Sequence, residues 1–196
     1  MAATRDRSLD VVVLVGSAGG IKPMESVLAG LPSDLDAAVV VLLHLTPQHP
    51  SVLAAILARK TAMSVKQAED GDVLEPGHVY VAPPDAHLLV NADGTLTLDH
   101  SPLVHYVRPS ADALLHSLAE NYDGRCLAVV LSGTGIDGAD GTLALKGAGG
   151  SVVVQDEATS EHFGMPSAAI DAGSVDAVLA VGQIGQAVVD FVGSRS

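Results

Sequence analysis

The chain has 196 residues, a formal net charge of −13, 48% hydrophobic residues and only 3% aromatic residues. This length suits one domain with a substantial core, and the acidic balance argues against non-specific binding to nucleic acid or to an anionic membrane, because both need a basic surface. The single cysteine, Cys126, excludes an internal disulfide and a cysteine-based metal cluster. No apolar run approaches the ~20 residues of a membrane span, and the N-terminus lacks a signal-peptide core, so we expect a cytoplasmic protein without direct membrane insertion.

The first half of the chain begins with a run of apolar residues that ends in a turn of small residues. The run Val11-Val12-Val13-Leu14-Val15 has no polar face, which is typical of a central strand in a parallel sheet. The turn is Gly16-Ser17-Ala18-Gly19-Gly20, whose glycines allow a sharp bend and leave backbone N–H groups at the start of a helix. Further patterns predict strands at 37–43, 64–67 and 77–82, helices at 21–29 and 52–57, and an antiparallel hairpin of 88–91 and 95–98. Pro47 and Pro50 frame the loop after 37–43, and Ser51 is expected to cap the next helix.

The second half repeats the alternation of strands and helices. Pro109 is expected at the first position of a helix at 109–121, and a strand at 127–131 leads into a second glycine-rich loop that contains Asp137. Further strands are predicted at 151–154 and 177–181, with helices at 142–146, 165–172 and 184–192. The repeated units predict a doubly wound α/β fold: a mostly parallel sheet with helices on both faces and one antiparallel hairpin. We expect residues 1–196 to form a single domain with a core at about 9–192.

Three residues with catalytic chemistry follow predicted strands. In open α/β sheets, sites form beyond the carboxyl ends of the strands, and Ser17, His44 and Asp137 all lie at such positions. A serine, a histidine and an aspartate are the parts of a nucleophile, a general base and an orienting acid. Spacing alone leaves other roles open: Ser17 as a turn or phosphate-loop residue, His44 as a strand-end cap, and Asp137 as a helix N-cap.

Short blocks in this sequence resemble the catalytic domain of bacterial chemotaxis protein-glutamate methylesterases (CheB-type). They follow the order of that family from about Asp10 to Val181: Gly16-Ser17-Ala18-Gly19-Gly20, Leu43-His44-Leu45-Thr46-Pro47, Glu69-Asp70-Gly71, Gly77-His78-Val79-Tyr80-Val81-Ala82-Pro83, Arg108-Pro109-Ser110, Leu131-Ser132-Gly133-Thr134-Gly135-Ile136-Asp137-Gly138, Gln155-Asp156-Glu157-Ala158-Thr159 and Phe163-Gly164-Met165-Pro166. Each block alone is weak, but together they are highly specific.

The resemblance implies a serine-type esterase with Ser17 as nucleophile, His44 as base and Asp137 as orienting acid. The backbone N–H groups of Ala18 and Thr134 are the candidate oxyanion donors. The expected reaction is hydrolysis of glutamyl methyl esters, with possible deamidation of glutamines, on the cytoplasmic helices of chemoreceptors or on another methylated signalling protein. No metal and no cofactor are expected. The classical enzyme also has an N-terminal receiver domain, and we expect none in this sequence, since the first strand starts near residue 9.

The sequence departs from the family pattern at several positions. Many members have Thr where this chain has Ala18, and Thr134 replaces a usual methionine, although both positions keep their N–H group. His162 stands where an apolar residue is common and offers a rival triad with Ser17 and Asp137. Arg108 is expected either to pair with a carboxylate of the receptor or to cap the following helix.

Two other functions fit parts of the pattern. A catalytically weak or silent relative that only binds a receptor or signalling partner is one alternative: the intact Ser17, His44 and Asp137 argue against it, whereas the changes at Ala18 and Thr134 keep it open. A phosphate- or nucleotide-binding domain is the other, but the glycine spacing differs from Gly-x-Gly-x-x-Gly, and His44 occupies the position where a ribose-binding acid is expected. The sequence gives no indication of the oligomeric state.

Overall fold

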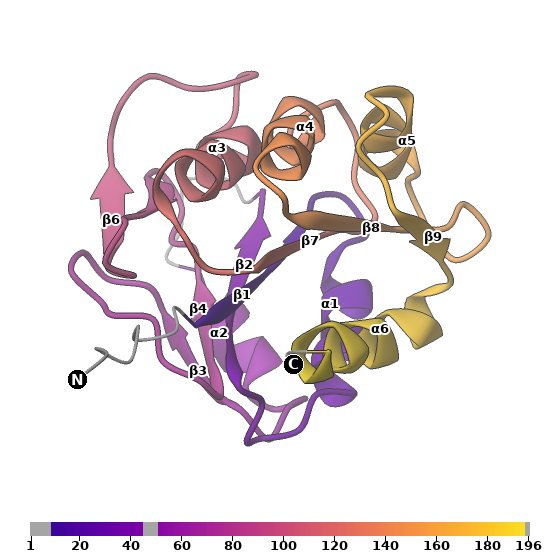
Figure 1. The fold of residues 1–196 in the computed structure, drawn as a ribbon. Coiled ribbons are helices and arrows are strands. Elements are labelled where there is room, and N and C mark those ends of the chain that lie inside the picture. The colour runs from indigo at the N-terminus through magenta and orange to yellow at the C-terminus, as the bar shows by residue number, and fades with distance from the viewer. Residues whose placement is uncertain (1–8, 45–50, 195–196) are drawn as a thin grey trace, which may run out of the picture.

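The computed structural model describes residues 9–44 and 51–194, which contain a seven-stranded parallel sheet covered by helices on both faces (Figure 1). The strands lie in the order β3-β4-β2-β1-β7-β8-β9. Their bounds are β1 (Asp10–Gly16), β2 (Ala37–Leu43), β3 (Ser64–Gln67), β4 (His78–Val81), β7 (Cys126–Val130), β8 (Ser151–Gln155) and β9 (Ala177–Leu179). Strands β5 (His87–Val90) and β6 (Leu96–Asp99) form the predicted antiparallel hairpin as a separate sheet. The predicted fold class is confirmed.

The helices divide into two layers according to the face of the sheet that they cover (Figure 1). Helices α1 (Ile21–Ala29), α2 (Leu53–Leu57) and α6 (Val181–Gly193) cover one face. Helices α3 (Ala111–Asn121), α4 (Ala139–Gly147) and α5 (Gly164–Asp171) cover the other, together with the hairpin.

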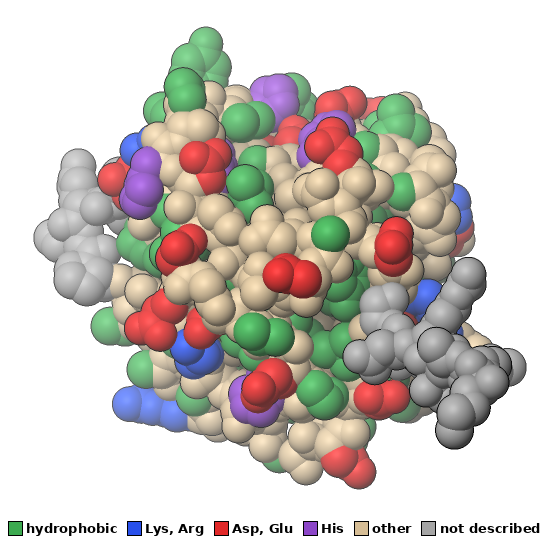
Figure 2. All heavy atoms as spheres, turned by 60° about the vertical axis from the view of Figure 1, so that its left-hand side comes forward, with side chains coloured by type: hydrophobic (Ala, Val, Ile, Leu, Met, Phe, Trp, Pro, Cys, Tyr) green, Lys and Arg blue, Asp and Glu red, His purple; other side chains and the backbone are tan. Residues whose placement is uncertain are grey.

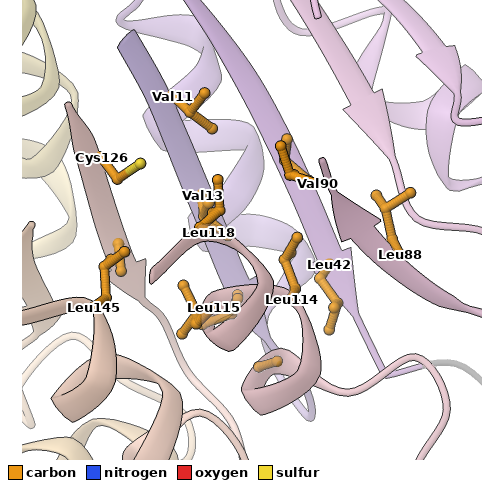
Figure 3. Packing of buried hydrophobic residues seen from close by; sticks show 14 of the residues in the cluster. Val11, Val13, Leu42, Leu88, Val90, Leu114, Leu115, Leu118, Cys126 and Leu145 are labelled. Carbon is orange, nitrogen blue, oxygen red and sulfur yellow. The ribbon is translucent and has the colours of Figure 1, made fainter. Parts of the chain in front are cut away.

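Strand β1 is the centre of both hydrophobic cores, because all seven of its residues are buried. Val11 and Val13 point toward α3, where they pack with Leu114, Leu115 and Leu118 (Figure 3). Val12 and Leu14 pack on the opposite face against α1 and α6. Each fully buried side chain of this size contributes about 1.5–3 kcal/mol to stability, so β1 is fixed firmly in the sheet.

Several predicted boundaries are wrong by a few residues. Helix α3 begins at Ala111 rather than Pro109, because Ser110 is the N-cap and its hydroxyl accepts a hydrogen bond from the N–H of Ala113. Helix α4 begins three residues earlier than predicted, at Ala139, and α6 begins at Val181 rather than Ile184. Helix α2 begins at Leu53 rather than Val52, and Val52 rather than Ser51 is its N-cap; Ser51 lies one residue earlier and accepts a hydrogen bond from the N–H of Leu53. The loop framed by Pro47 and Pro50 lies outside the described residues.

The acidic composition is visible at the surface. On the face shown in Figure 2, Asp and Glu side chains are spread widely and Lys and Arg are sparse. Among the helices of the described residues, none is long and apolar enough to cross a membrane.

Candidate active site

The candidate site lies where the sheet topology changes direction. From β1 the chain builds outward to β2 and β4 on one side, and later to β7 and β8 on the other. Such a switch point leaves a crevice beyond the carboxyl ends of the central strands. Gly16 at the end of β1 pairs with Leu43 at the end of β2, so the next residues, Ser17 and His44, are neighbours across the strands. The N–H of His44 donates to the carbonyl of Gly16 over 3.2 Å.

The turn that carries Ser17 is held from two sides. The N–H of Ser17 donates to the carbonyl of Ser132 over 3.0 Å, and the Ser132 hydroxyl donates to the carbonyl of Ala18 over 2.9 Å. Gly19 has a φ of +73°, and a Cβ added there would lie 2.8 Å from both the Ser132 Oγ and the Glu161 Cβ. This turn therefore requires glycine at position 19.

Ser17 and His44 open into the same pocket, which has a volume of about 410 Å³. Its wall combines the turn after β1, the start of α1, the end of β2 and one residue of the β8–α5 loop. The lining residues are Ser17, Ala18, Gly19, Ile21, Lys22, Leu43, His44 and Glu161. This volume is large enough to admit one side chain of a larger substrate.

Asp137 reaches the site from the loop between β7 and α4. Its Oδ2 lies 2.8 Å from Nε2 of His44, and only 4% of the aspartate side chain is exposed. Burial by itself raises the pKa of Asp137, but hydrogen bonds from His44, Ser110 and the N–H of Ala111 outweigh it and hold the pKa below its ordinary value. The carboxylate therefore stays ionised beside the imidazole. Because Nε2 faces Asp137, Nδ1 is the ring nitrogen of His44 that this contact leaves available.

The side chain of Asp137 also binds the backbone at the N-terminus of helix α3. Its Oδ2 accepts the N–H of Ala111 over 2.6 Å, and its Oδ1 accepts the Ser110 hydroxyl over 2.7 Å and the N–H of Asp112 over 3.2 Å. Asp137 is not the N-cap of the helix that follows it, since Gly138 occupies that position in α4. The negative charge is stabilised by these N–H groups at the start of α3 and by the dipole of the helix.

The two expected oxyanion donors lie on adjoining turns. Ala18 follows Ser17, and Thr134 lies two residues beyond Ser132, whose hydroxyl and carbonyl join the turns. Among the described residues, the N–H groups of Ala18 and Thr134 have no hydrogen-bond acceptor. Within the part of the chain that the structure describes, the Ser17 hydroxyl makes no hydrogen bond to His44, whose Nε2 contacts Asp137.

His162 and Arg108, for which the sequence left alternative roles open, have other contacts in the structure. The His162 ring lies 3.6 Å from Glu161, and the imidazole that contacts Asp137 within the described chain is that of His44. Arg108 neither caps α3 nor projects as a free cation: its Nε donates to Asp85 over 3.1 Å, and its Nη1 donates to the carbonyl of Ser101 over 2.8 Å. Arg108 therefore ties together the loops on either side of the β5–β6 hairpin.

Sequence reasoning missed the residues that support the triad candidates. Ser110 and Ser132 are both completely buried, and each bonds directly to a loop of the site. The only signal for them was their position inside two blocks of the family resemblance. Leu45, Thr46 and Pro47, from a third block, lie outside the described residues. Within the described residues, no group of three or more His, Cys, Asp or Glu side chains is placed to hold a metal ion.

Comparisons with known proteins show which family the sequence matches. Residues 12–188 match the family model described as CheB methylesterase. A protein-glutamate methylesterase/protein-glutamine glutaminase 2 of Caulobacter vibrioides is 40% identical over 192 residues, which are 96% of this chain and 54% of that protein. The corresponding protein of Anaeromyxobacter dehalogenans is 41% identical over 95% of this chain and 54% of its own length. The chain thus spans about half the length of these relatives.

A solved structure gives the same result for the fold. The CheB methylesterase catalytic domain of Thermotoga maritima matches with a TM-score of 0.88 and 36% sequence identity, over 94% of this chain and 98% of that chain. The seven-stranded sheet and its helices are therefore those of this catalytic domain. The chain belongs to the CheB methylesterase family.

Proposed function

We propose that this protein is a protein-glutamate methylesterase that hydrolyses glutamyl methyl esters through Ser17, His44 and Asp137. The observation that carries the proposal is the 2.8 Å contact between His44 and the buried Asp137, next to Ser17 at the switch point of the sheet. A phosphate-binding turn has no use for a base and its orienting acid. Family membership supports the same reaction.

The proposed reaction has two steps. Nδ1 of His44 takes the Ser17 proton while the hydroxyl oxygen attacks the ester carbonyl, and Asp137 stabilises the resulting imidazolium. The same proton then passes to the methoxide oxygen, the ester C–O bond breaks, and methanol leaves an acyl-enzyme on Ser17. Water attacks this acyl group with His44 again as base, which releases a glutamate side chain and restores the serine.

The tetrahedral intermediates carry a negative oxygen, which the N–H groups of Ala18 and Thr134 stabilise. One such donor is commonly worth about 3 kcal/mol of transition-state stabilisation, or more than 100-fold in rate. The residues that differ from the usual family pattern here contribute only their backbone N–H. We therefore propose an active enzyme rather than a silent relative.

The substrate follows from the chemistry of the pocket and from the family. We propose methylated glutamates on the cytoplasmic helices of a chemoreceptor or of another methylated signalling protein. Such esters are neutral, so the acidic charge of −13 does not repel the reacting group itself. A glutamine side chain has nearly the same shape, and attack on its amide by the same route releases ammonia; the relative in Caulobacter vibrioides is named for both activities.

The test is methanol release from methylated receptor fragments by single variants. Ser17→Ala, His44→Ala and Asp137→Ala are each expected to lose most of the activity, with strongly non-additive losses when combined. His162→Ala is the matched control, because its ring contacts Glu161 and not the triad. Full activity in Ser17→Ala overturns the mechanism. An inactive His162→Ala beside an active His44→Ala reassigns the base.

A further inference from the structure

At their N-termini, helices α3 and α4 each donate backbone hydrogen bonds to a carboxylate from the segment of the other helix. Asp137, just before α4, accepts the N–H groups of Ala111 and Asp112 at the start of α3. In return, Oδ1 of Asp112 accepts the N–H of Gly138 over 3.0 Å and that of Gly141 over 2.7 Å, at the start of α4. Each helix thus supplies a negative charge to the positive end of the other. The two helix starts are locked together beside His44.

Ser110 holds this junction through hydrogen bonds of its hydroxyl and of its backbone N–H. Ser110 is completely buried, and its hydroxyl donates to Oδ1 of Asp137 over 2.7 Å. The hydroxyl oxygen of Ser110 also accepts the N–H of Ala113 over 3.3 Å. Its own N–H donates to Nδ1 of the buried His87, whose Nε2 lies 3.1 Å from the carbonyl of Pro102. The serine is therefore fixed by bonds to α3 and to the hairpin strand β5.

These contacts divide the two oxygens of Asp137 between different tasks. Oδ1 is held by the Ser110 hydroxyl and the N–H of Asp112, whereas Oδ2 faces His44 and the N–H of Ala111. A carboxylate turns freely about its last bond unless both oxygens have partners. Holding Oδ1 on one side aims Oδ2 at the imidazole on the other.

We propose that Ser110 and Asp112 are positioning residues of the esterase reaction, acting through Asp137. Ser110 holds the carboxylate directly, and Asp112 holds the first turn of α4 and hence the loop that carries Asp137. Neither side chain lines the pocket of Ser17 and His44. This inference rests on the proposed function, because it assigns both residues to the same triad.

The first experiment compares Ser110→Ala with Ser117→Ala. Ser117 lies on the same helix, is also buried, and its hydroxyl bonds to Val90 and Leu114 rather than to Asp137. Steady-state hydrolysis of a methylated receptor fragment by Ser110→Ala should show kcat lowered about tenfold or more with KM unchanged, because a small misalignment of a catalytic group is costly. Ser117→Ala should keep its kcat, and Ser110→Thr, which retains the hydroxyl, should recover most of the loss. Equal kcat values for Ser110→Ala and Ser117→Ala overturn the inference.

The second experiment tests the positioning role of Asp112, and it does not depend on whether Ser110→Ala folds. Asp112→Asn keeps an oxygen for the N–H groups of Gly138 and Gly141, so its kcat should stay within about threefold of the parent, whereas Asp112→Ala should lose about tenfold or more. The same kcat for Asp112→Ala and Asp112→Asn contradicts the role of Asp112.

A spectroscopic readout separates failure of this inference from failure of the proposed function. The ring N–H of His44 bonded to a carboxylate gives a downfield proton resonance, assigned by its loss in His44→Ala. This signal should weaken in Ser110→Ala and persist in Ser117→Ala, in protein without substrate and whatever reaction it catalyses. An unchanged signal in Ser110→Ala refutes the positioning role alone. Full esterase activity in the Ser17→Ala variant refutes the proposed mechanism instead.

Discussion

Replacing Asp137 by asparagine changes one atom at the point where the candidate triad meets helix α3. The carboxylate accepts four hydrogen bonds, from His44 Nε2, the Ser110 hydroxyl and the N–H groups of Ala111 and Asp112. One oxygen faces the N–H of Ala111 and the other faces that of Asp112. In either orientation of the asparagine amide, its NH₂ therefore opposes a backbone donor.

The cost follows from these contacts. A buried donor left without an acceptor costs about 1–3 kcal/mol, and the lost charge at the helix N-terminus adds about 0.3–1 kcal/mol or more. We expect Asp137→Asn to lower the free energy of unfolding by about 3 kcal/mol, which for a domain of this size lowers Tm by about 6–12 °C. If the NH₂ turns toward His44, it forces the ring proton onto Nδ1, the nitrogen that must accept the Ser17 proton. Loss of the correct tautomer lowers kcat by about 10⁴-fold in serine proteases with this change.

The assay is methanol release from a methylated receptor fragment at a temperature well below the Tm of the variant, with urea unfolding measured in parallel. The control is Asp140→Asn, which changes an exposed carboxylate on α4 that contacts His116 and not the site. Asp140→Asn should leave both kcat and the unfolding free energy nearly unchanged. A folded Asp137→Asn variant with kcat within tenfold of the parent refutes the role assigned to Asp137.

Three further predictions test other parts of the structure. Hydrogen bonds hold the pKa of Asp137 below its ordinary value despite its burial, so the stability that this carboxylate contributes is present above pH ~4 and is lost as pH falls through its folded pKa. The difference in free energy of unfolding between the parent and Asp137→Asn, measured in urea, should therefore shrink between pH 7 and pH 3. A constant difference contradicts this prediction. Burial raises the pKa of Cys126 to about 12, so a thiol reagent at pH 8 should label it only in urea. Rapid labelling of the native protein would contradict the burial of this thiol. Gly19→Ala, at φ +73°, should cost about 1–3 kcal/mol in urea unfolding and most of the esterase activity, whereas Gly182→Ala, with open space around its Cβ, should cost neither; equal effects would exclude the crowding at Gly19 as the cause.

The sequence was sufficient for the fold because its signals are local. Runs such as Val11-Val12-Val13-Leu14-Val15 are buried on both faces, and the parallel sheet that they predict is present. The predicted strands that precede Ser17 and His44 lie side by side, since Gly16 pairs with Leu43. Boundaries were less predictable: Pro109 suggested a helix start, but the capping hydroxyl of Ser110 delays it to Ala111.

The supporting contacts could not be predicted because they join residues far apart in the chain. Ser110 and Asp137 are separated by 27 positions, and their contact depends on how α3 packs against α4. The reciprocal bonds from Gly138 and Gly141 to Asp112 depend on the same packing. No local pattern of the sequence encodes the relative position of two helices on one face of a sheet.

The most direct test of the proposed mechanism is covalent trapping of the nucleophile. The protein is treated with a labelled fluorophosphonate, digested, and its peptides are identified by mass spectrometry. We predict one adduct, on Ser17, formed much more slowly in His44→Ala and absent in Ser17→Ala. An enzyme that releases methanol but carries its adduct on another residue, or reacts equally fast without His44, contradicts the account.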